Sequence, residues 1–241
     1  MMTDLDLYRR GTDTMLAAWG EYARAAKSAA LERLPGVAVA VFPSGPEREF
    51  YNNALLSPGA PAAAVDAMEA VYAEAGVTAF AAWTHESDPV VRAELERRGY
   101  VLDTTTRAMG LALDEIRVPR PELPFGPASW ADYLAYEGLD PDFLRDGDHA
   151  ALHVLAAREQ GAILSAALAY DAAGDCGIYN VGTVEAARRR GLGTAITAAQ
   201  VHQARDRGCT TASLQSTPMA ERVYAAVGFR DLGRILEYVR R

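Results

Sequence analysis

Apolar positions along the chain follow helical and extended spacings in turn, which predicts alternating helices and strands. In the first segment Leu16, Trp19 and Tyr22 stand three residues apart with small residues between them, so a helix is expected over 5–34. Beyond it, short apolar runs bounded by proline and glycine are typical of strands. The further elements predicted here are strands at 37–42 and 50–55, a helix at 61–75, a strand at 77–83, a helix at 88–98 and a strand at 100–113.

A proline-rich stretch, 119–127, predicts a boundary between a first domain, 1–115, and a second domain, 116–241. In the second domain three strands joined by short turns predict an antiparallel meander, and the later strand–helix–strand step requires a parallel crossover. The fold class is therefore α/β with a mixed sheet. The elements predicted are helices at 129–136 and 141–144, strands at 151–157, 163–170 and 178–184, a helix at 193–207, a strand at 211–215, a helix at 218–227 and a strand at 229–239.

The two domains end in a similar way. Each has a strand, then a helix, then a glycine–aromatic pair that opens another strand: Gly99-Tyr100 in the first domain and Gly228-Phe229 in the second. This rhythm indicates that the first domain is a degenerate copy of the second.

Composition narrows the function classes. Half of the residues are hydrophobic, yet no apolar run is long enough to span a membrane, and the charged start does not resemble a secretion signal. The net charge is -8 and Lys27 is the only lysine, which argues against a nucleic-acid surface. Cys176 and Cys209 stand apart from the histidines, so no metal site is expected. We expect reduced thiols, a cytoplasmic setting and neither membrane nor nucleic-acid partners.

The most informative stretch joins the predicted strand 178–184 to the predicted helix 193–207. It carries three arginines and then Gly191 and Gly193, which allow the backbone to approach an anion closely at the positive end of a helix. A dinucleotide fingerprint would need a third glycine near Ile196, and a nucleotide-triphosphate loop would need a lysine. An ordinary strand-to-helix turn is the remaining alternative to a diphosphate cradle.

Two motifs identify a family resemblance. Arg188-x-x-Gly191-x-Gly193 after a strand, and Tyr224-x-x-x-Gly228-Phe229 later, resemble the GNAT superfamily of acetyl-CoA-dependent N-acetyltransferases. The resemblance covers 129–241, while 1–113 is similar to the degenerate first lobe of two-lobed members. It implies a GNAT-like acyl-CoA N-acyltransferase fold with a second, degenerate lobe, and acetyl-CoA as co-substrate.

The resemblance also implies roles for individual residues. The backbone of Thr183 and Val184 would pair with the acyl-pantetheine arm, and the Val184 N–H would face the thioester oxygen as the oxyanion donor. Tyr224 would lie near the coenzyme sulfur, where a phenol of pKa about 10 serves better as a hydrogen-bond donor than as a full proton donor to a thiolate. The coenzyme-binding residues implied are Thr183, Val184, Arg188, Arg189, Arg190, Gly191, Leu192, Gly193, Thr194, Ser216 and Tyr224.

The sequence departs from the family pattern in two places. Strand 178–184 lacks the glutamate that many members use to deprotonate the amine. The asparagine that members often have after the next strand is also absent, and Ser216 and Thr217 stand in that region. Thr217 precedes Pro218 and would cap the following helix. The first domain has no cradle motif around 57–59, and Leu95 stands where Tyr224 stands in the second. The remaining candidates for the base are Glu137, His149, His153, or a water molecule near Tyr179 and Asn180.

The predicted function is transfer of an acetyl group to the primary amine of a small molecule, with peptide or protein amino groups left open as acceptors. The alternative is a non-catalytic acyl-CoA-binding sensor or scaffold, which the missing strand glutamate favours. A homodimer is also left open. The predicted acceptor contacts are Trp130, Tyr133, Tyr136 and, in the first domain, Trp83.

Overall fold

The computed structural model describes residues 2–45, 51–122, 125–139 and 147–240. The chain divides into two compact units, each built from two stretches of sequence. Unit 1 comprises Met1–Ala18 and Arg107–Leu232, and unit 2 comprises Trp19–Thr106 and Gly233–Arg241. Neither unit is a consecutive half of the sequence. The division into domains 1–115 and 116–241 stays a prediction.

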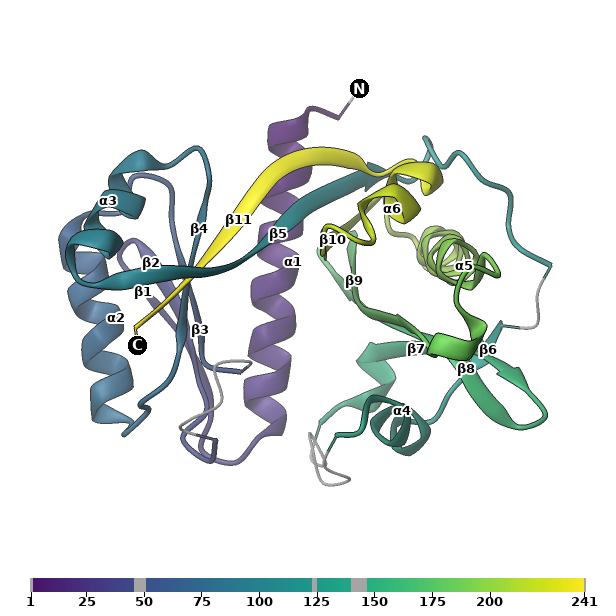
Figure 1. Cartoon of the computed structure of the whole chain (residues 1–241), viewed down its shortest axis with the longest axis horizontal. Helices are drawn as coiled ribbons and strands as arrows, with labels where there is room; N and C mark the ends of the chain where they lie inside the picture. Colours follow the sequence, from purple (N-terminus) through teal and green to yellow (C-terminus); the bar gives the residue numbers. More distant parts are fainter. Residues whose placement is uncertain (1, 46–50, 123–124, 140–146, 241) are drawn as a thin grey trace. The chain divides into compact units, whose positions relative to one another are not determined.

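Unit 2 contains an antiparallel meander followed by a parallel crossover (Figure 1). Its three meander strands are β1–β3, helix α2 returns the chain so that β4 lies parallel to β3, and α3 follows β4. Every residue of β2 is buried, and its valines pack against Met68 and Tyr72 of α2. The bounds are β1 Ala30–Leu34, β2 Val37–Val41, β3 Asn53–Leu56, α2 Ala62–Glu74, β4 Ala81–His85 and α3 Pro89–Arg97.

Unit 1 follows the same plan. Strands β7–β9 form a meander, α5 returns the chain so that β10 lies parallel to β9, and α6 follows β10. The short strand β6 and helix α4 precede the meander. The bounds are β6 Phe125–Pro127, α4 Trp130–Glu137, η1 His149–Ala151, β7 Leu152–Glu159, β8 Ala162–Ala172, β9 Asp175–Thr183, η2 Glu185–Ala187, α5 Leu192–Asp206, β10 Thr211–Ser216 and α6 Glu221–Val227.

The last strand of each repeat completes the other unit. Strand β5, Tyr100–Ala112, follows the unit 2 helix α3, yet its residues 107–112 pair antiparallel with β10 in unit 1. Strand β11, Arg230–Arg240, follows the unit 1 helix α6, yet its residues 235–239 pair antiparallel with β4 in unit 2. The α/β class and the mixed sheet predicted from the sequence are confirmed, and the shared element order of the two units agrees with the predicted repeat.

The first helix ends earlier than its apolar spacing predicts. Helix α1 covers Asp4–Ala25, Ser28 adopts a positive φ of 59°, and the chain then enters β1 as an edge strand paired with β2. The prediction over 5–34 was wrong beyond Ala25, because β1 depends on a partner strand that local spacing does not reveal.

The helix near Thr217 also begins later than predicted. Its first residue is Glu221 and its N-cap is Ala220, after a turn in which the Ala220 N–H donates to the Thr217 carbonyl at 3.0 Å. The predicted N-cap role of Thr217 was therefore wrong. The predicted helix 141–144 lies outside the described residues, and the three-residue strand β6 was not predicted.

Candidate functional site

In unit 1 the parallel strands β9 and β10 pair over only part of their length. The paired residues run from Thr211 opposite Asp175 to Ser213 opposite Gly177, and beyond them β10 stays paired with β5. In β9 a bulge interrupts the pairing with β8, because one β8 residue faces Asn180 and Val181 together, and Asn180 has a positive φ of 50°. Such bulges bend a strand. The ends of β9 and β10 are consequently not joined by ladder hydrogen bonds.

The hydrogen-bond direction at the end of β9 distinguishes the two predicted backbone donors. The Val184 N–H donates to the Leu164 carbonyl of β8 at 2.9 Å. Amides alternate in direction along an antiparallel pair, so the N–H of Thr183, which faces Ser165, is directed away from β8. The Val184 N–H is thus engaged within the sheet, and Thr183 is the residue whose N–H faces the β10 side. The oxyanion role of Val184 stays a prediction.

The loop after β9 leads into α5, and several of its backbone N–H groups form no hydrogen bond. The N–H groups of Ala187 and Arg188 donate within the turn η2, and the next N–H that donates within the protein is that of Ala195, to the Gly191 carbonyl at 3.0 Å. Gly191 is the N-cap, with φ of 79°, and no side chain caps the helix. Within the described part of the chain, the N–H groups of residues 189–194 donate to no protein acceptor. These N–H donors lie at the N-terminus of α5, where the helix dipole makes the electrostatic potential positive.

The glycines of this loop leave room for a ligand. A Cβ built on Gly191 would meet nothing within 4 Å, and one built on Gly193 would meet only Val223 at 3.8 Å. Among the arginines, the Arg188 Nε donates to the Thr183 carbonyl at 3.3 Å, while Arg190 pairs with Glu159 at 3.0 Å. Leu192 is buried against Ala157 and Ala187, and so anchors the first turn of α5. The result is a cradle of open amides with a basic border.

Tyr224 lies on α6 in the core of unit 1. Its side chain is 6% exposed, and burial raises the pKa of its phenol to about 12. The Phe229 N–H donates to the Tyr224 carbonyl at 3.1 Å, and the two rings stand edge to face with centroids 6.1 Å apart. A phenol with this pKa remains protonated at neutral pH. Ser216, at the end of β10, is buried, and its hydroxyl donates to the Thr217 carbonyl at 2.8 Å.

Helix α4 brings aromatic residues to the bulge. The Asn180 Nδ2 donates to the Tyr133 hydroxyl at 2.7 Å, and the Tyr133 ring packs against Trp130 with centroids 5.2 Å apart. The Tyr136 hydroxyl lies over Gly182, where an added Cβ would approach it to 2.8 Å. Tyr133 is therefore buried core, while Tyr136 is the aromatic residue placed beside the end of β9. The structural importance of Gly182 was not predicted from the sequence.

Glu137 ends α4 next to Tyr136 and is half-buried. Burial raises the pKa of its carboxyl. Burial raises the pKa of Tyr136, the charge of Glu137 adds to the rise, and Arg188 opposes it. Glu137 is the base candidate that shares this neighbourhood.

The other base candidates fit less well. His153 lies 3.6 Å from Asp171, which is bound on both oxygens by Arg207 just beyond the C-terminal end of α5. The helix has 15 residues and thus a length of about 22 Å, so this histidine is remote from the cradle. The His149 side chain lies outside the described residues. Trp83 belongs to unit 2, and its acceptor role stays a prediction.

The equivalent loop of unit 2 is closed. Pro58 and Pro61 have no N–H to offer, and the Gly59 N–H donates to the Asp88 carboxylate at 2.6 Å. The same carboxylate group accepts from the Val91 N–H at 3.1 Å and so caps α3. Leu95, which stands where Tyr224 stands in unit 1, is fully buried in the core. With few open amides and a leucine in place of the tyrosine, this lobe is not expected to bind coenzyme.

Within the described residues, no three His, Cys, Asp or Glu side chains gather in a way that would hold a metal ion. No helix in the same residues is both long and apolar enough to cross a membrane.

Comparisons with known proteins agree with this fold. A family model for the acetyltransferase (GNAT) family matches residues 112–229. A GCN5-related N-acetyltransferase from Kribbella flavida is similar in structure, with a TM-score of 0.72, 18% identity, and coverage of 97% of this chain and 95% of that one. One from Sphaerobacter thermophilus has a TM-score of 0.60 and 17% identity, covering 87% and 82%.

A third similar structure is a tandem GNAT protein from the clavulanic acid biosynthesis pathway, with a TM-score of 0.57, 14% identity, and coverage of 84% of this chain and 77% of that one. A comparison with curated proteins finds no match. The two sequence motifs lie within or overlap the matched segment and lead to one conclusion: residues 112–229 of this chain belong to the acetyltransferase (GNAT) family.

Proposed function

We propose that the chain transfers an acetyl group from acetyl-CoA to the primary amine of a small molecule. The observation that carries this proposal is the row of backbone amides at 189–194, which have no protein acceptor in the described structure and lie at the N-terminus of α5. A diphosphate is the ligand that such a row fits, because it offers several anionic oxygens to neighbouring N–H groups.

The residues present fit the coenzyme. Open space beside Gly191 and Gly193 admits the diphosphate, and the unpaired ends of β9 and β10 would receive the pantetheine arm. Arg188, Arg189 and Arg190 would attract it at longer range, since exposed charges of this kind act mainly through the general field. When bound, acetyl-CoA would supply the thioester carbonyl that an amine attacks.

Three groups of this chain have roles in that chemistry. The Thr183 N–H would donate to the oxygen on which negative charge develops. Tyr224 would hold its proton and donate a hydrogen bond to the departing sulfur, because full transfer from a phenol of pKa about 12 to a thiolate of an ordinary thiol is uphill by about 5 kcal/mol. Glu137 would accept the proton of the amine, directly or through water.

The binding step is tested by a substitution that separates affinity from stability. Asp in place of Gly193 adds a negative charge in the first turn of α5, which favours the helix by about 0.3–1 kcal/mol but repels a diphosphate. We expect Gly193→Asp to leave thermal stability unchanged or higher and to weaken acetyl-CoA binding at least a hundredfold by calorimetry. Gly193→Asn has the same shape without the charge and should lose much less.

Turnover is tested with a panel of small amines and a free-thiol assay. Tyr224→Phe should bind acetyl-CoA as the parent chain does and release thiol about a hundredfold more slowly. Tight coenzyme binding with no turnover on any small amine, peptide or protein would instead favour the sensor function. Equal binding by Gly193→Asp and the parent chain would refute the cradle itself.

A further inference from the structure

Unit 2 contains a cluster of aromatic and acidic side chains around Trp83 that has no part in the coenzyme cradle of unit 1. Trp83 of β4 and Glu237 of β11 are direct partners across the antiparallel pair, and Trp19 of α1 packs against Trp83 with ring centroids 5.3 Å apart at an interplanar angle of 83°. All three residues belong to unit 2 and keep part of their surface exposed. Part of each of these side chains is therefore open to solvent, while the Trp83 indole Nε1 is buried.

Glu237 is mostly buried without a cation. Within the part of the chain that the structure describes, no arginine, lysine or histidine pairs with its carboxylate, and the charge that acts on it is the carboxylate of Asp103. Burial and Asp103 raise the pKa of Glu237 to about 7, while the Thr106 hydroxyl acts in the opposite direction. A carboxylate kept in such surroundings is costly unless a positive group is supplied.

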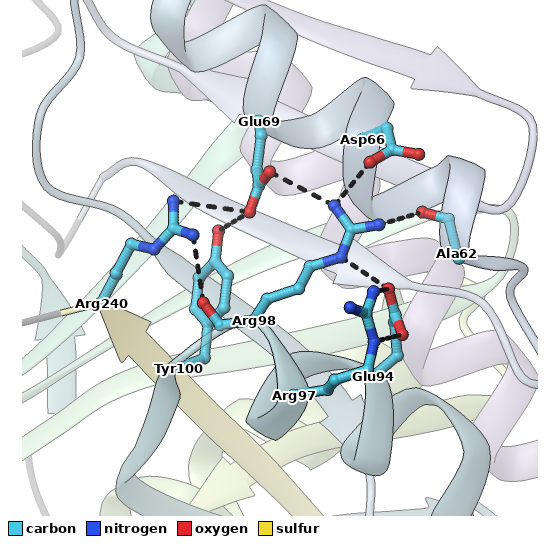
Figure 2. A network of polar contacts seen from close by, with 8 residues as sticks. All are labelled: Ala62, Asp66, Glu69, Glu94, Arg97, Arg98, Tyr100 and Arg240. Carbon is cyan, nitrogen blue, oxygen red and sulfur yellow. Dashed lines mark hydrogen bonds and ion pairs between the residues drawn. The ribbon is translucent and has the colours of Figure 1, made fainter.

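The other carboxylates of unit 2 show what a satisfied group looks like there. In the network of Figure 2, Arg98 contacts Asp66 at 2.6 Å, Glu94 at 2.6 Å and Glu69 at 3.3 Å. Arg240 adds a contact to Glu69 at 3.7 Å. These acids, on α2 and α3, are neutralised by the protein's own guanidinium groups. Glu237 is the contrasting case on the neighbouring sheet.

Trp83 supplies an independent sign of a missing ligand. Its indole Nε1 is buried and has no acceptor among the described residues. Buried N–H donors in native structures nearly always have a partner, and an unfilled one calls for an explanation such as a ligand or ordered water. An oxygen acceptor close to Glu237 would satisfy it.

A metal ion is a poor explanation for this combination. Hard cations need several oxygen ligands, and an indole N–H cannot coordinate one. An organic ammonium group fits instead, because it donates hydrogen bonds to a carboxylate and is attracted to the face of a tryptophan ring.

We propose that unit 2 binds an alkylammonium group bearing a neighbouring hydroxyl or carbonyl oxygen, with Glu237 as counter-ion and Trp83 as aromatic wall and N–H donor. The ligand class is thus an amino alcohol or a related oxygenated amine. This site goes beyond the proposed acetyl transfer, since it lies in the unit whose loop is closed to coenzyme and does not depend on the cradle of unit 1.

The test is an NMR titration of the full chain at pH 8, where Glu237 is ionised and simple amines are still protonated. The probes are ethanolamine and ethylamine, which differ by one hydroxyl. The chain has three tryptophans, so each indole N–H signal can be assigned by substitution. We expect ethanolamine to shift the Trp83 indole signal and to bind more tightly than ethylamine.

Three variants make the result specific. Glu237→Gln, which keeps the size of the side chain, should weaken ethanolamine binding at least tenfold, and Trp83→Phe should abolish the preference for ethanolamine over ethylamine. Glu32→Gln, an exposed residue of β1, should change nothing and controls for general attraction to a chain of net charge -8. The proposal is overturned if the Trp83 signal does not move, or if Glu237→Gln binds as the parent chain or as Glu32→Gln does. Calorimetry with acetyl-CoA on the same samples measures coenzyme binding at the cradle of unit 1 independently of amine binding in unit 2.

Discussion

At the residue scale, the carboxyl of Glu137 is the group whose environment most directly shapes a reaction. It lies next to Tyr136 at the end of α4, and burial raises the pKa of its carboxyl. A more basic carboxylate is a better acceptor for the proton of an ammonium or of an attacking amine.

The sign of the pH effect follows from that shift. Glu137 accepts a proton only when ionised, so kcat/KM for an amine should rise as the pH increases through its raised pKa. We expect Glu137→Gln to lower kcat/KM about a hundredfold at pH 8 and to remove this limb from a profile measured between pH 5 and 9.

Stability supplies the control for this variant. A carboxyl whose pKa is raised on folding costs stability as the pH rises past its unfolded value, because the folded state must then hold an unfavourable charge. Glu137→Gln should therefore be at least as stable as the parent chain at pH 8. An unchanged profile in a stable variant would assign the base elsewhere.

The sequence predicted the residues of the site better than their orientation. The motif at 188–193 located the cradle because glycines and a following helix determine backbone chemistry locally. It placed the oxyanion donor at Val184, one residue beyond the Thr183 N–H that faces β10. A one-residue step reverses the direction of an N–H in a strand, and the bulge at Asn180 that sets this phase depends on the partner strand.

At the element scale, the contrast between the two strand-to-helix loops explains why one repeat has an open cradle. In unit 1 no side chain caps α5, whereas in unit 2 the Asp88 carboxylate caps α3 and also holds the Gly59 N–H ahead of α2. The start of α2, the counterpart of α5, has no side-chain cap either. The difference lies in the loop before it, where the Gly59 N–H is bound by Asp88 and Pro58 and Pro61 have no N–H to offer a phosphate.

This contrast predicts opposite effects on stability and binding. Asp88→Ala removes a buried helix cap and a hydrogen bond to Gly59, so the free energy of unfolding in urea should fall by about 1–3 kcal/mol. Acetyl-CoA should still bind with one equivalent per chain and unchanged affinity. A second equivalent in the variant would show that Asp88 alone closes the unit 2 loop.

Element identity was otherwise predictable where caps and breakers are local. Pro61 and Gly76 delimit α2 closely, whereas the edge strand β1 was predicted as helix. The residues of β1 are exposed or only partly buried, and their extended form depends on pairing with β2 rather than on their own spacing.

At the scale of the whole molecule, the exchanged strands determine what can fold alone. Unit 1 needs residues 107–112 of β5 beside β10, and unit 2 needs residues 235–239 of β11 beside β4. The proline-rich stretch that suggested a boundary near residue 115 lies within unit 1. The local composition of a segment can predict a turn, but the sheet that a strand joins depends on partner strands far away in the sequence.

Fragments cut at that position should fail separately and succeed together. We expect 1–115 and 116–241, expressed alone, to lack cooperative thermal unfolding and acetyl-CoA binding, because each would lack a strand that its main sheet requires. Co-expression should restore both properties. If 116–241 alone bound acetyl-CoA with full affinity, the contribution of β5 to unit 1 would be dispensable.

The late position of β11 also sets an order of events on the ribosome. The core strands of unit 2 emerge early, since β4 ends at His85, but the strand that protects its edge is made only after Arg230. During the intervening synthesis β4 would present unpaired peptide groups, which invite association with other nascent chains. Translation speed and chaperone supply should consequently affect the yield of this protein more than its final stability would suggest.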